Sequence, residues 1–384
     1  MAAHLVLWIS AGVVFYAYVG YPILVWILQW LFPRPVRKQP IEPSVSLVVA
    51  AYNEARVIER KIRNALELDY PAQRLEIIIA SDGSDDNTAD LARGAAAQLE
   101  AADRVRVLAY PVNRGKLAVL NETVPQARGD IVVFSDASSM LAPDALRQLV
   151  ANFADPRVGA ASGIYRVRKQ EESRLGVQED FYWQYETFLK RQESRLGVVL
   201  GAHGSLYAIR KALYPFPSPG LINDDYIIPL RIIHQGYRVA YELDAVAFEE
   251  ASEMGGFSRR VRIMTGNFEQ LREIVALLWP PRWLALFVFL SHKVGRLLAP
   301  FAMLAGLLAN AFLVRDAMYF WTACLQGVFY ALALIGAAVP LRPKALRLPY
   351  YFCMINLAAF PGLYHALRGG RRLAWKRPSP PIER

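Results

Sequence analysis

Apolar residues are concentrated at the two ends of the chain, and the first apolar stretch spans residues 5–32 without a Lys, Arg, Asp or Glu. This stretch exceeds the roughly 20 helical residues that cross a hydrocarbon core. No Lys or Arg precedes it and no small-residue cleavage site follows it, which favours a retained membrane helix over a cleaved signal peptide. Arg34, Arg37 and Lys38 follow directly, so the positive-inside bias places the next segment in the cytosol.

Three further apolar segments lie toward the C-terminal end, at about residues 283–314, 318–339 and 349–367. The first contains His292, Lys293 and Arg296, so we expect part of it to lie in the membrane interface or to face protein. If all three segments cross the membrane, the basic residues after position 367 end outside, against the charge bias. Three interpretations are open: the last segment is re-entrant, the segment at residues 283–314 does not cross fully, or the chain is an exception to the charge bias.

The chain between these ends has the alternating pattern of an α/β domain. Apolar runs at residues 45–51, 75–80, 105–109 and 131–134 predict strands, and the stretches 53–68, 89–99 and 115–127 predict helices between them. Strands that alternate with helices through short connections indicate a mostly parallel sheet flanked by helices. Ligands of such sheets bind outside the carboxyl ends of the strands.

The predicted organisation has six parts. They are a membrane helix at 1–32, a linker at 33–43, a cytosolic α/β domain at 44–256, interfacial amphipathic helices at 257–281, about three membrane segments at 282–368, and a basic cytosolic or exposed tail at 369–384. Much of the net charge of +10 flanks the apolar segments, where it favours the anionic cytosolic leaflet rather than nucleic acid. Cys324 and Cys353 have neither the spacing of metal ligands nor that of a disulfide framework.

Polar residues that could carry chemistry follow the predicted strands. Asn53 and Glu54 can cap a helix or contact a nucleotide. Asp82 can accept hydrogen bonds from a base or ribose, and the later residues of its loop are better placed to cap the next helix. Asp136 can hold Mg²⁺ or Mn²⁺ beside a diphosphate, or it can cap its own loop.

A second group of polar residues lies further along the chain. Asp224 and Asp225 open an apolar helix after a loop rich in Gly and Pro. Negative charge stabilises a helix N-terminus, and a positioned carboxylate can also take a proton from a sugar hydroxyl. His203 lies in a glycine-containing loop, where it could approach an acceptor or a metal, or serve the structure.

The order of these segments over roughly residues 44–270 resembles the family 2 glycosyltransferases of the GT-A fold. The matching segments are residues 50–54, 81–88, 113–116, 134–138, 207–211, 224–225, 231–232 and 236–238. With its apolar ends, the chain is similar to the membrane branch of cellulose, hyaluronan and poly-N-acetylglucosamine synthase catalytic subunits. The resemblance implies a GT-A nucleotide-diphospho-sugar transferase domain, inversion at the transferred sugar, and Mg²⁺ or Mn²⁺.

The resemblance also implies roles for single residues. For the nucleotide sugar, these are Ala51, Tyr52, Asn53, Glu54, Asp82, Lys116, Asp136 and Arg262, with Asp82 at the uridine-contacting position. Asp136 stands at the first position of the Asp-x-Asp metal motif, and Ser138 replaces its second aspartate. Asp225 falls on the catalytic base position, with Asp224 in place of the usual glutamate.

Two further features concern the acceptor. His203, Gly204 and Ser205 are expected on the acceptor side of the site. Arg262 lies in the stretch that corresponds to the Gln-x-x-Arg-Trp segment of processive members, but Ile263 replaces the Trp, so processive synthesis is not implied.

The function predicted from these residues is that of a hexosyltransferase-type enzyme at the inner face of a bacterial plasma membrane. It would transfer a sugar, by the resemblance from a UDP-sugar, to a growing polysaccharide or a lipid-linked glycan. Its expected partners are this donor, this acceptor, the lipid bilayer and other polysaccharide synthesis or export proteins, but no nucleic acid. Transfer of one sugar to polyprenyl phosphate and a non-catalytic role in an export assembly are the alternatives.

Overall fold

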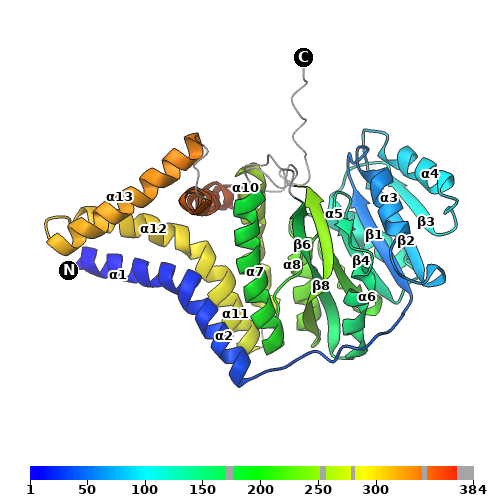
Figure 1. The fold of residues 1–384 in the computed structure, drawn as a ribbon, viewed down its shortest axis with the longest axis horizontal. Helices are drawn as coiled ribbons and strands as arrows, with labels where there is room; N and C mark the ends of the chain where they lie inside the picture. The colour runs from blue at the N-terminus through cyan, green and yellow to red at the C-terminus, as the bar shows by residue number, and fades with distance from the viewer. Residues whose placement is uncertain (169–175, 251–256, 278–281, 340–343, 370–384) are drawn as a thin grey trace, which may run out of the picture.

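The computed structural model describes residues 1–168, 176–250, 257–277, 282–339 and 344–369. Figure 1 shows an α/β domain built on one twisted sheet, with a set of kinked apolar helices beside it. The helix α7 (Gly176–Leu196) stands between these two parts and contacts α2 (Tyr21–Leu31) of the apolar set. The basic tail predicted at residues 369–384 lies outside the described residues from position 370 onward.

In the part of the chain that the structure describes, the sheet has eight strands in the order β3-β2-β1-β4-β7-β6-β8-β5. They are β1 (Val45–Ala51), β2 (Leu75–Asp82), β3 (Val105–Tyr110), β4 (Ile131–Asp136), β5 (Met140–Leu141), β6 (Val158–Arg168), β7 (Tyr207–Arg210) and β8 (Arg238–Glu250). β1 pairs in parallel with β2 and β4, and β2 pairs in parallel with β3. The four predicted strands and their mostly parallel arrangement are therefore confirmed. β7 is antiparallel to β4 and β6, while β6 and β8 are parallel.

Helices cover both faces of the sheet because alternate residues of the central strands point to opposite sides. Leu47 and Val133 belong to a core with α3 (Ile58–Leu66), α4 (Thr88–Gln98) and α6 (Ala145–Val150). Val48 and Phe134 belong to a core with α5 (Lys116–Gln126), α7 and α8 (Asp224–His234). The helix predicted from residue 53 begins only at Ile58, since Asn53 has a φ of 55° and turns the chain into a loop.

Among the described residues, three helices are long and apolar enough to cross a membrane: Ala2–Leu31, Trp283–Ala311 and Ala317–Ala338. The first joins α1 (Ala2–Phe15) to α2 through a π-helical turn, and the second joins α11 (Trp283–Val288) to α12 (Gly295–Ala311) through another. Inserted π-turns bend helices, and both helices change direction at these turns (Figure 1). The third is α13 (Ala317–Ala338).

The last predicted membrane segment is not one long helix. It consists of α14 (Leu348–Leu357) and α15 (Ala359–Leu367), and at about 1.5 Å per residue neither spans a hydrocarbon core of about 30 Å. Pro361 explains the break, because its ring has no N–H and excludes the carbonyl of the residue four positions earlier, where α14 ends. Residues 257–277 of the predicted interfacial segment form one helix, α10 (Phe257–Leu277), which packs against α15. Residues 278–281 of that segment lie outside the described residues.

Candidate active site at the carboxyl ends of the strands

The loops after β1 and β2 are joined by hydrogen bonds. The Asn53 N–H donates to Ser84 Oγ at 3.1 Å, and Asn53 Oδ1 accepts the Asp85 N–H at 2.8 Å. The Glu54 N–H donates to Thr88 Oγ1 at 2.8 Å. Ala51 is buried at the end of β1, and the Tyr52 hydroxyl reaches Asp85 at 3.5 Å. The predicted nucleotide-binding residues 51–54 therefore lie beside the loop that follows Asp82.

Asp82 is fully buried at the end of β2. Its two carboxylate oxygens accept the backbone N–H groups of Arg114 at 2.9 Å and Gly115 at 2.8 Å. These bonds fix the loop that leads into α5, whose first residue is Lys116. In this structure Asp82 positions Lys116, and its direct contact with a nucleotide stays a prediction.

Lys116 links two carboxylates that come from distant parts of the chain. Its Nζ lies 2.9 Å from Asp136 Oδ1 and 3.2 Å from Asp224 Oδ1. Burial lowers the pKa of Lys116, but the charges of Asp136, Asp224 and Asp225 outweigh burial and raise the net pKa above its usual value. Lys116 is therefore a permanent cation at the centre of the site.

Asp136 ends β4, and 37% of its side chain is exposed. Ser138 lies in the turn that follows, which is closed by the Ser139 N–H donating to the Asp136 carbonyl at 3.2 Å. Within the described ranges, no three His, Cys, Asp or Glu side chains gather as metal ligands. Mg²⁺ is often held by one or two carboxylates together with substrate phosphates, so Asp136 fits an ion that is shared with a diphosphate.

Lys61 lies beneath Asp136 and was not identified from the sequence. It is fully buried, and its Nζ donates to Ser135 Oγ at 2.7 Å and to the Ser139 carbonyl. Burial lowers the pKa of Lys61 to about 7, although the charges of Asp136 and Glu249 act in the opposite direction. The helical spacing of Lys61 with Ile58, Ile62 and Ala65 puts it on the buried face of α3, and this spacing could have identified it from the sequence.

Asp224 and Asp225 open α8 but have different surroundings. Asp224 is 5% exposed, accepts the Tyr207 hydroxyl at 2.9 Å and pairs with Lys116. Asp225 is half-buried, and its Oδ2 accepts the Gly204 N–H at 3.1 Å. Burial and the charge of Asp224 raise the pKa of Asp225 to about 6, against the effect of Lys116. A carboxylate with this pKa is ionised at neutral pH and is a stronger base than an ordinary aspartate.

The three predicted acceptor-side residues have different surroundings in the structure. A Cβ atom at Gly204 would lie 3.5 Å from both Asp136 Oδ2 and Asp225 Oδ2, so Gly204 faces the two carboxylates. The His203 ring is instead buried, and its Nε2 is 2.9 Å from the Tyr241 hydroxyl. Ser205 is buried, and its carbonyl accepts from Ser135 Oγ at 2.8 Å. Gly204 is thus the member of this group that borders the space between the carboxylates.

Arg262 reaches the site from α10. Burial and the charge of Arg259 lower the pKa of Arg262, while Asp136, Asp224 and Asp225 act in the opposite direction. The helix is held against the start of α8, since Gln270 Nε2 donates to the Asn223 carbonyl at 3.2 Å and Asn223 Nδ2 donates to Asn267 Oδ1 at 3.1 Å. α10 therefore brings Arg262 within electrostatic range of all three carboxylates.

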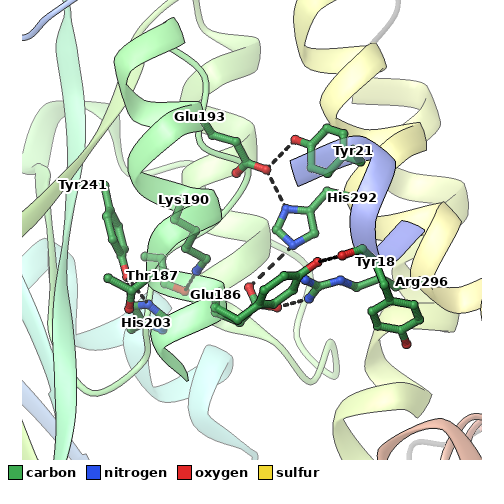
Figure 2. A network of polar contacts seen from close by, with 12 residues as sticks. Tyr18, Tyr21, Glu186, Thr187, Lys190, Glu193, His203, Tyr241, His292 and Arg296 are labelled. Carbon is green, nitrogen blue, oxygen red and sulfur yellow. Dashed lines mark hydrogen bonds and ion pairs between the residues drawn. The ribbon is translucent and has the colours of Figure 1, made fainter. Parts of the chain in front are cut away.

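A buried polar network joins α7 to the apolar helices (Figure 2). Glu193 accepts the Tyr21 hydroxyl at 2.6 Å and lies 2.6 Å from His292 Nδ1. His292 Nε2 is 3.5 Å from Glu186, which also pairs with Arg296. The expectation that part of this apolar segment faces protein is therefore met by His292 and Arg296. The sequence did not show which residues of α7 would oppose them.

Comparisons with known proteins agree with this geometry. Residues 43–265 match the family described as glycosyltransferase like family 2. The chain is 30% identical over 234 residues to the poly-beta-1,6-N-acetyl-D-glucosamine synthase of Staphylococcus aureus (strain COL), covering 59% of this chain and 55% of that protein. The synthase of the same name from Staphylococcus epidermidis (strain ATCC 35984) is 26% identical over 299 residues, covering 72% and 70%. The chain thus spans about half the length of the first of these relatives.

A solved structure resembles almost the whole chain. It is the mannosyltransferase PcManGT from Pyrobaculum calidifontis in complex with GDP-Man and Mn²⁺, with a TM-score of 0.73 and 24% identity. The match covers 94% of this chain and 99% of that one, and it shows that the fold is GT-A. Because the family match extends over more than half of the chain and includes every strand, this protein belongs to the glycosyltransferase-like family 2.

Proposed function

We propose that this protein is a membrane-bound inverting glycosyltransferase that transfers a sugar from a nucleotide-diphospho-sugar to a growing polysaccharide or a lipid-linked glycan. The observation that carries the proposal is Asp225, a carboxylate with a pKa of about 6 that faces Asp136 across Gly204. The names of the relatives, which are polysaccharide synthases, support a glycan acceptor. The neighbour solved with GDP-Man supports a nucleotide-sugar donor.

Lys116 and Arg262 are the cations for the donor diphosphate. A guanidinium presents a planar set of donors that can bind two oxygens at once, and an ammonium acts as a point charge. Lys116 is already paired with Asp136 and Asp224, so a bound diphosphate would compete with these carboxylates for the same ammonium. Arg262 approaches the same carboxylates from α10.

Asp225 is placed to act on the acceptor. Its carboxylate takes the proton of the acceptor hydroxyl while the oxygen attacks the anomeric carbon of the donor sugar. The bond from that carbon to the diphosphate breaks, and the nucleoside diphosphate leaves with the electron pair. Attack from the side opposite the leaving group inverts the configuration. A general base of this kind contributes typically about 10²–10⁴-fold to the rate.

A divalent cation, Mg²⁺ or Mn²⁺, belongs to the proposal. Asp136 would hold it together with the diphosphate, and Ser138 offers a neighbouring hydroxyl in the same turn. Such an ion stabilises the negative charge of the leaving diphosphate as a Lewis acid. The neighbour solved with Mn²⁺ supports this assignment.

The three candidate membrane helices support a location in the plasma membrane with the α/β domain in the cytosol. Helix Ala2–Leu31 would enter the cytosol, and Trp283–Ala311 and Ala317–Ala338 would leave it and return. The basic residues after α15 would then lie inside, in agreement with the charge bias. Association with other polysaccharide synthesis or export proteins stays a prediction from the sequence resemblance.

The test is to incubate membranes that contain the protein with a panel of radiolabelled UDP- and GDP-sugars and to size the products. We expect one donor to label a glycan or a lipid, and Asp225→Asn to reduce labelling by about 10²–10⁴-fold. Asp90→Asn is the matched control, because Asp90 is an exposed carboxylate in the first turn of α4. If no donor labels a product, and nucleoside diphosphates do not bind the purified protein, the non-catalytic alternative replaces the proposal.

A further inference from the structure

One cation of the helix Trp283–Ala311 forms no ion pair with a carboxylate among the residues that the structure describes. Its π-helical turn carries His292 and Lys293, and Arg296 follows in the first turn of α12. His292 and Arg296 face the two α7 glutamates (Figure 2). Lys293 forms no hydrogen bond or ion pair with any other part of the chain that the structure describes, and its Nζ lies 4.6 Å from the centre of the Tyr226 ring. An unpaired cation in an apolar helix is costly and commonly marks a functional site.

A second lysine also lies within electrostatic range of Asp225. Lys190 of α7 is 8% exposed, and its Nζ donates to the Ala202 carbonyl at 3.2 Å, beside the loop of His203 (Figure 2). Burial and the charge of Lys293 lower the pKa of Lys190 to about 8, while Asp225 acts in the opposite direction. The two lysines are therefore close enough to affect each other, and both act on Asp225.

The groups around these lysines include donors that are not fully used, although the charges of Asp225 and Glu193 act on both lysines. The Tyr226 hydroxyl is buried and has no hydrogen-bond partner within the described ranges. An ammonium has three N–H groups, of which Lys190 uses one on the Ala202 carbonyl. Unused donors of this kind match an anion with several oxygens. The cations assigned to the donor diphosphate, Lys116 and Arg262, come from α5 and α10. Lys190 and Lys293 come from α7 and the membrane helix.

We infer that Lys190 and Lys293 bind the phosphate of a lipid-linked acceptor and thereby bring its reacting group to Asp225. The lipid source follows from the position of Lys293, since a phosphate on an apolar chain reaches an apolar helix more readily than a free anion or a neutral polysaccharide does. The phosphate belongs to the link between the lipid and a sugar, and a hydroxyl of that sugar is the group that Asp225 deprotonates. This inference rests on the proposed function and names the class of its acceptor.

The experiment measures binding of three probes to the purified full-length protein in detergent: farnesyl phosphate, farnesol and inorganic phosphate. Lys293→Met keeps most of the length of the side chain and removes its charge in an apolar helix, so the fold should be retained with an unchanged or higher melting temperature. We expect this variant to lose about tenfold or more of the affinity for farnesyl phosphate, as expected for removal of one partner of a desolvated charge pair. Its affinities for farnesol and for UDP or GDP should not change.

Three further variants make the result specific. Lys190→Met should show the same selective loss, and Lys293→Arg, which keeps the charge, should retain binding. Arg315→Met is the matched control, because it removes an exposed cation from the loop between α12 and α13.

Several outcomes overturn the inference. Equal affinity of the wild type for farnesyl phosphate and farnesol removes the phosphate site. If inorganic phosphate displaces farnesyl phosphate at equal concentration, the site does not select a phosphate on a lipid. If Lys293→Met binds UDP or GDP more weakly than the wild type does, Lys293 belongs to the donor site. If the wild type transfers sugar but Lys293→Met binds farnesyl phosphate as tightly as the wild type does, this inference is wrong and the proposed function stands. If farnesyl phosphate binding depends on the lysines but the protein transfers no sugar, the proposed function is wrong. The bound lipid is then not an acceptor.

Discussion

The pH dependence of turnover tests the role of Asp225 most directly. With a pKa of about 6, Asp225 is ionised to about 90% at pH 7 and to about 10% at pH 5, whereas an aspartate with an ordinary pKa of about 3.9 stays over 90% ionised at both. Because only the ionised form accepts a proton, we expect kcat/KM to fall about tenfold between pH 7 and pH 5. The acid limb of the profile should have its midpoint near pH 6.

Asp224→Asn should move this limb to lower pH. The charge of Asp224 raises the pKa of Asp225, and Lys116 lowers it. The substitution removes the first effect and frees Lys116 from one of its carboxylate partners, so both changes favour the ionised form of Asp225. The amide oxygen can still accept the Tyr207 hydroxyl, which limits the structural disturbance.

The assay measures initial rates of sugar transfer from about pH 5 to about pH 8 at constant ionic strength. Each sample is returned to pH 7 afterwards to show that activity recovers and that the protein did not unfold. A flat profile down to pH 5 would refute the assignment of Asp225 as the base. If the acid limb of Asp224→Asn stays in place or moves to higher pH, the charge of Asp224 does not raise the pKa of Asp225 as the structure indicates.

Four further predictions concern the metal, the donor, the acceptor space and the membrane junction. Activity should be lost in excess chelator after metal-free purification and restored by Mn²⁺ or Mg²⁺; full activity in chelator would remove the metal from the proposal. Arg262→Lys should weaken binding of nucleoside diphosphate more than Arg259→Lys does, and equal affinities in a titration would leave only a lipid-headgroup role for Arg262. Gly204→Ala places a methyl group 3.5 Å from two carboxylate oxygens, so kcat should fall by about 10²-fold with an unchanged melting temperature. A wild-type kcat would contradict the prediction that the acceptor occupies the space that Gly204 borders. Tyr21→Phe removes a buried hydrogen bond to Glu193 and should destabilise the protein by about 1.5–3 kcal/mol, which a thermal melt in detergent would show and an unchanged melt would contradict.

Local sequence patterns were sufficient to predict the strands of the central sheet and the polar loops that follow them. The run of residues 45–51 predicted a buried strand because all seven residues are apolar or small, and β1 has these bounds. The membrane helices were recognisable for a similar reason, since length and apolarity alone decide whether a helix can cross a bilayer. The helix expected from residue 53 was wrong at its start, because hydrogen bonds from the neighbouring loop hold Asn53 at positive φ.

Only the tertiary structure decided which polar side chains meet. Glu193 lies 172 positions from Tyr21 and 99 from His292, and no local periodicity links residues so far apart. The same holds for Lys116, which joins the end of β4 to the start of α8. The environment of Asp225 depends on charges from α5, α7 and its own helix, so its pKa is a property of the fold. Short-range patterns report which face of an element is buried, whereas the balance of buried charges depends on contacts that form only when distant segments pack together.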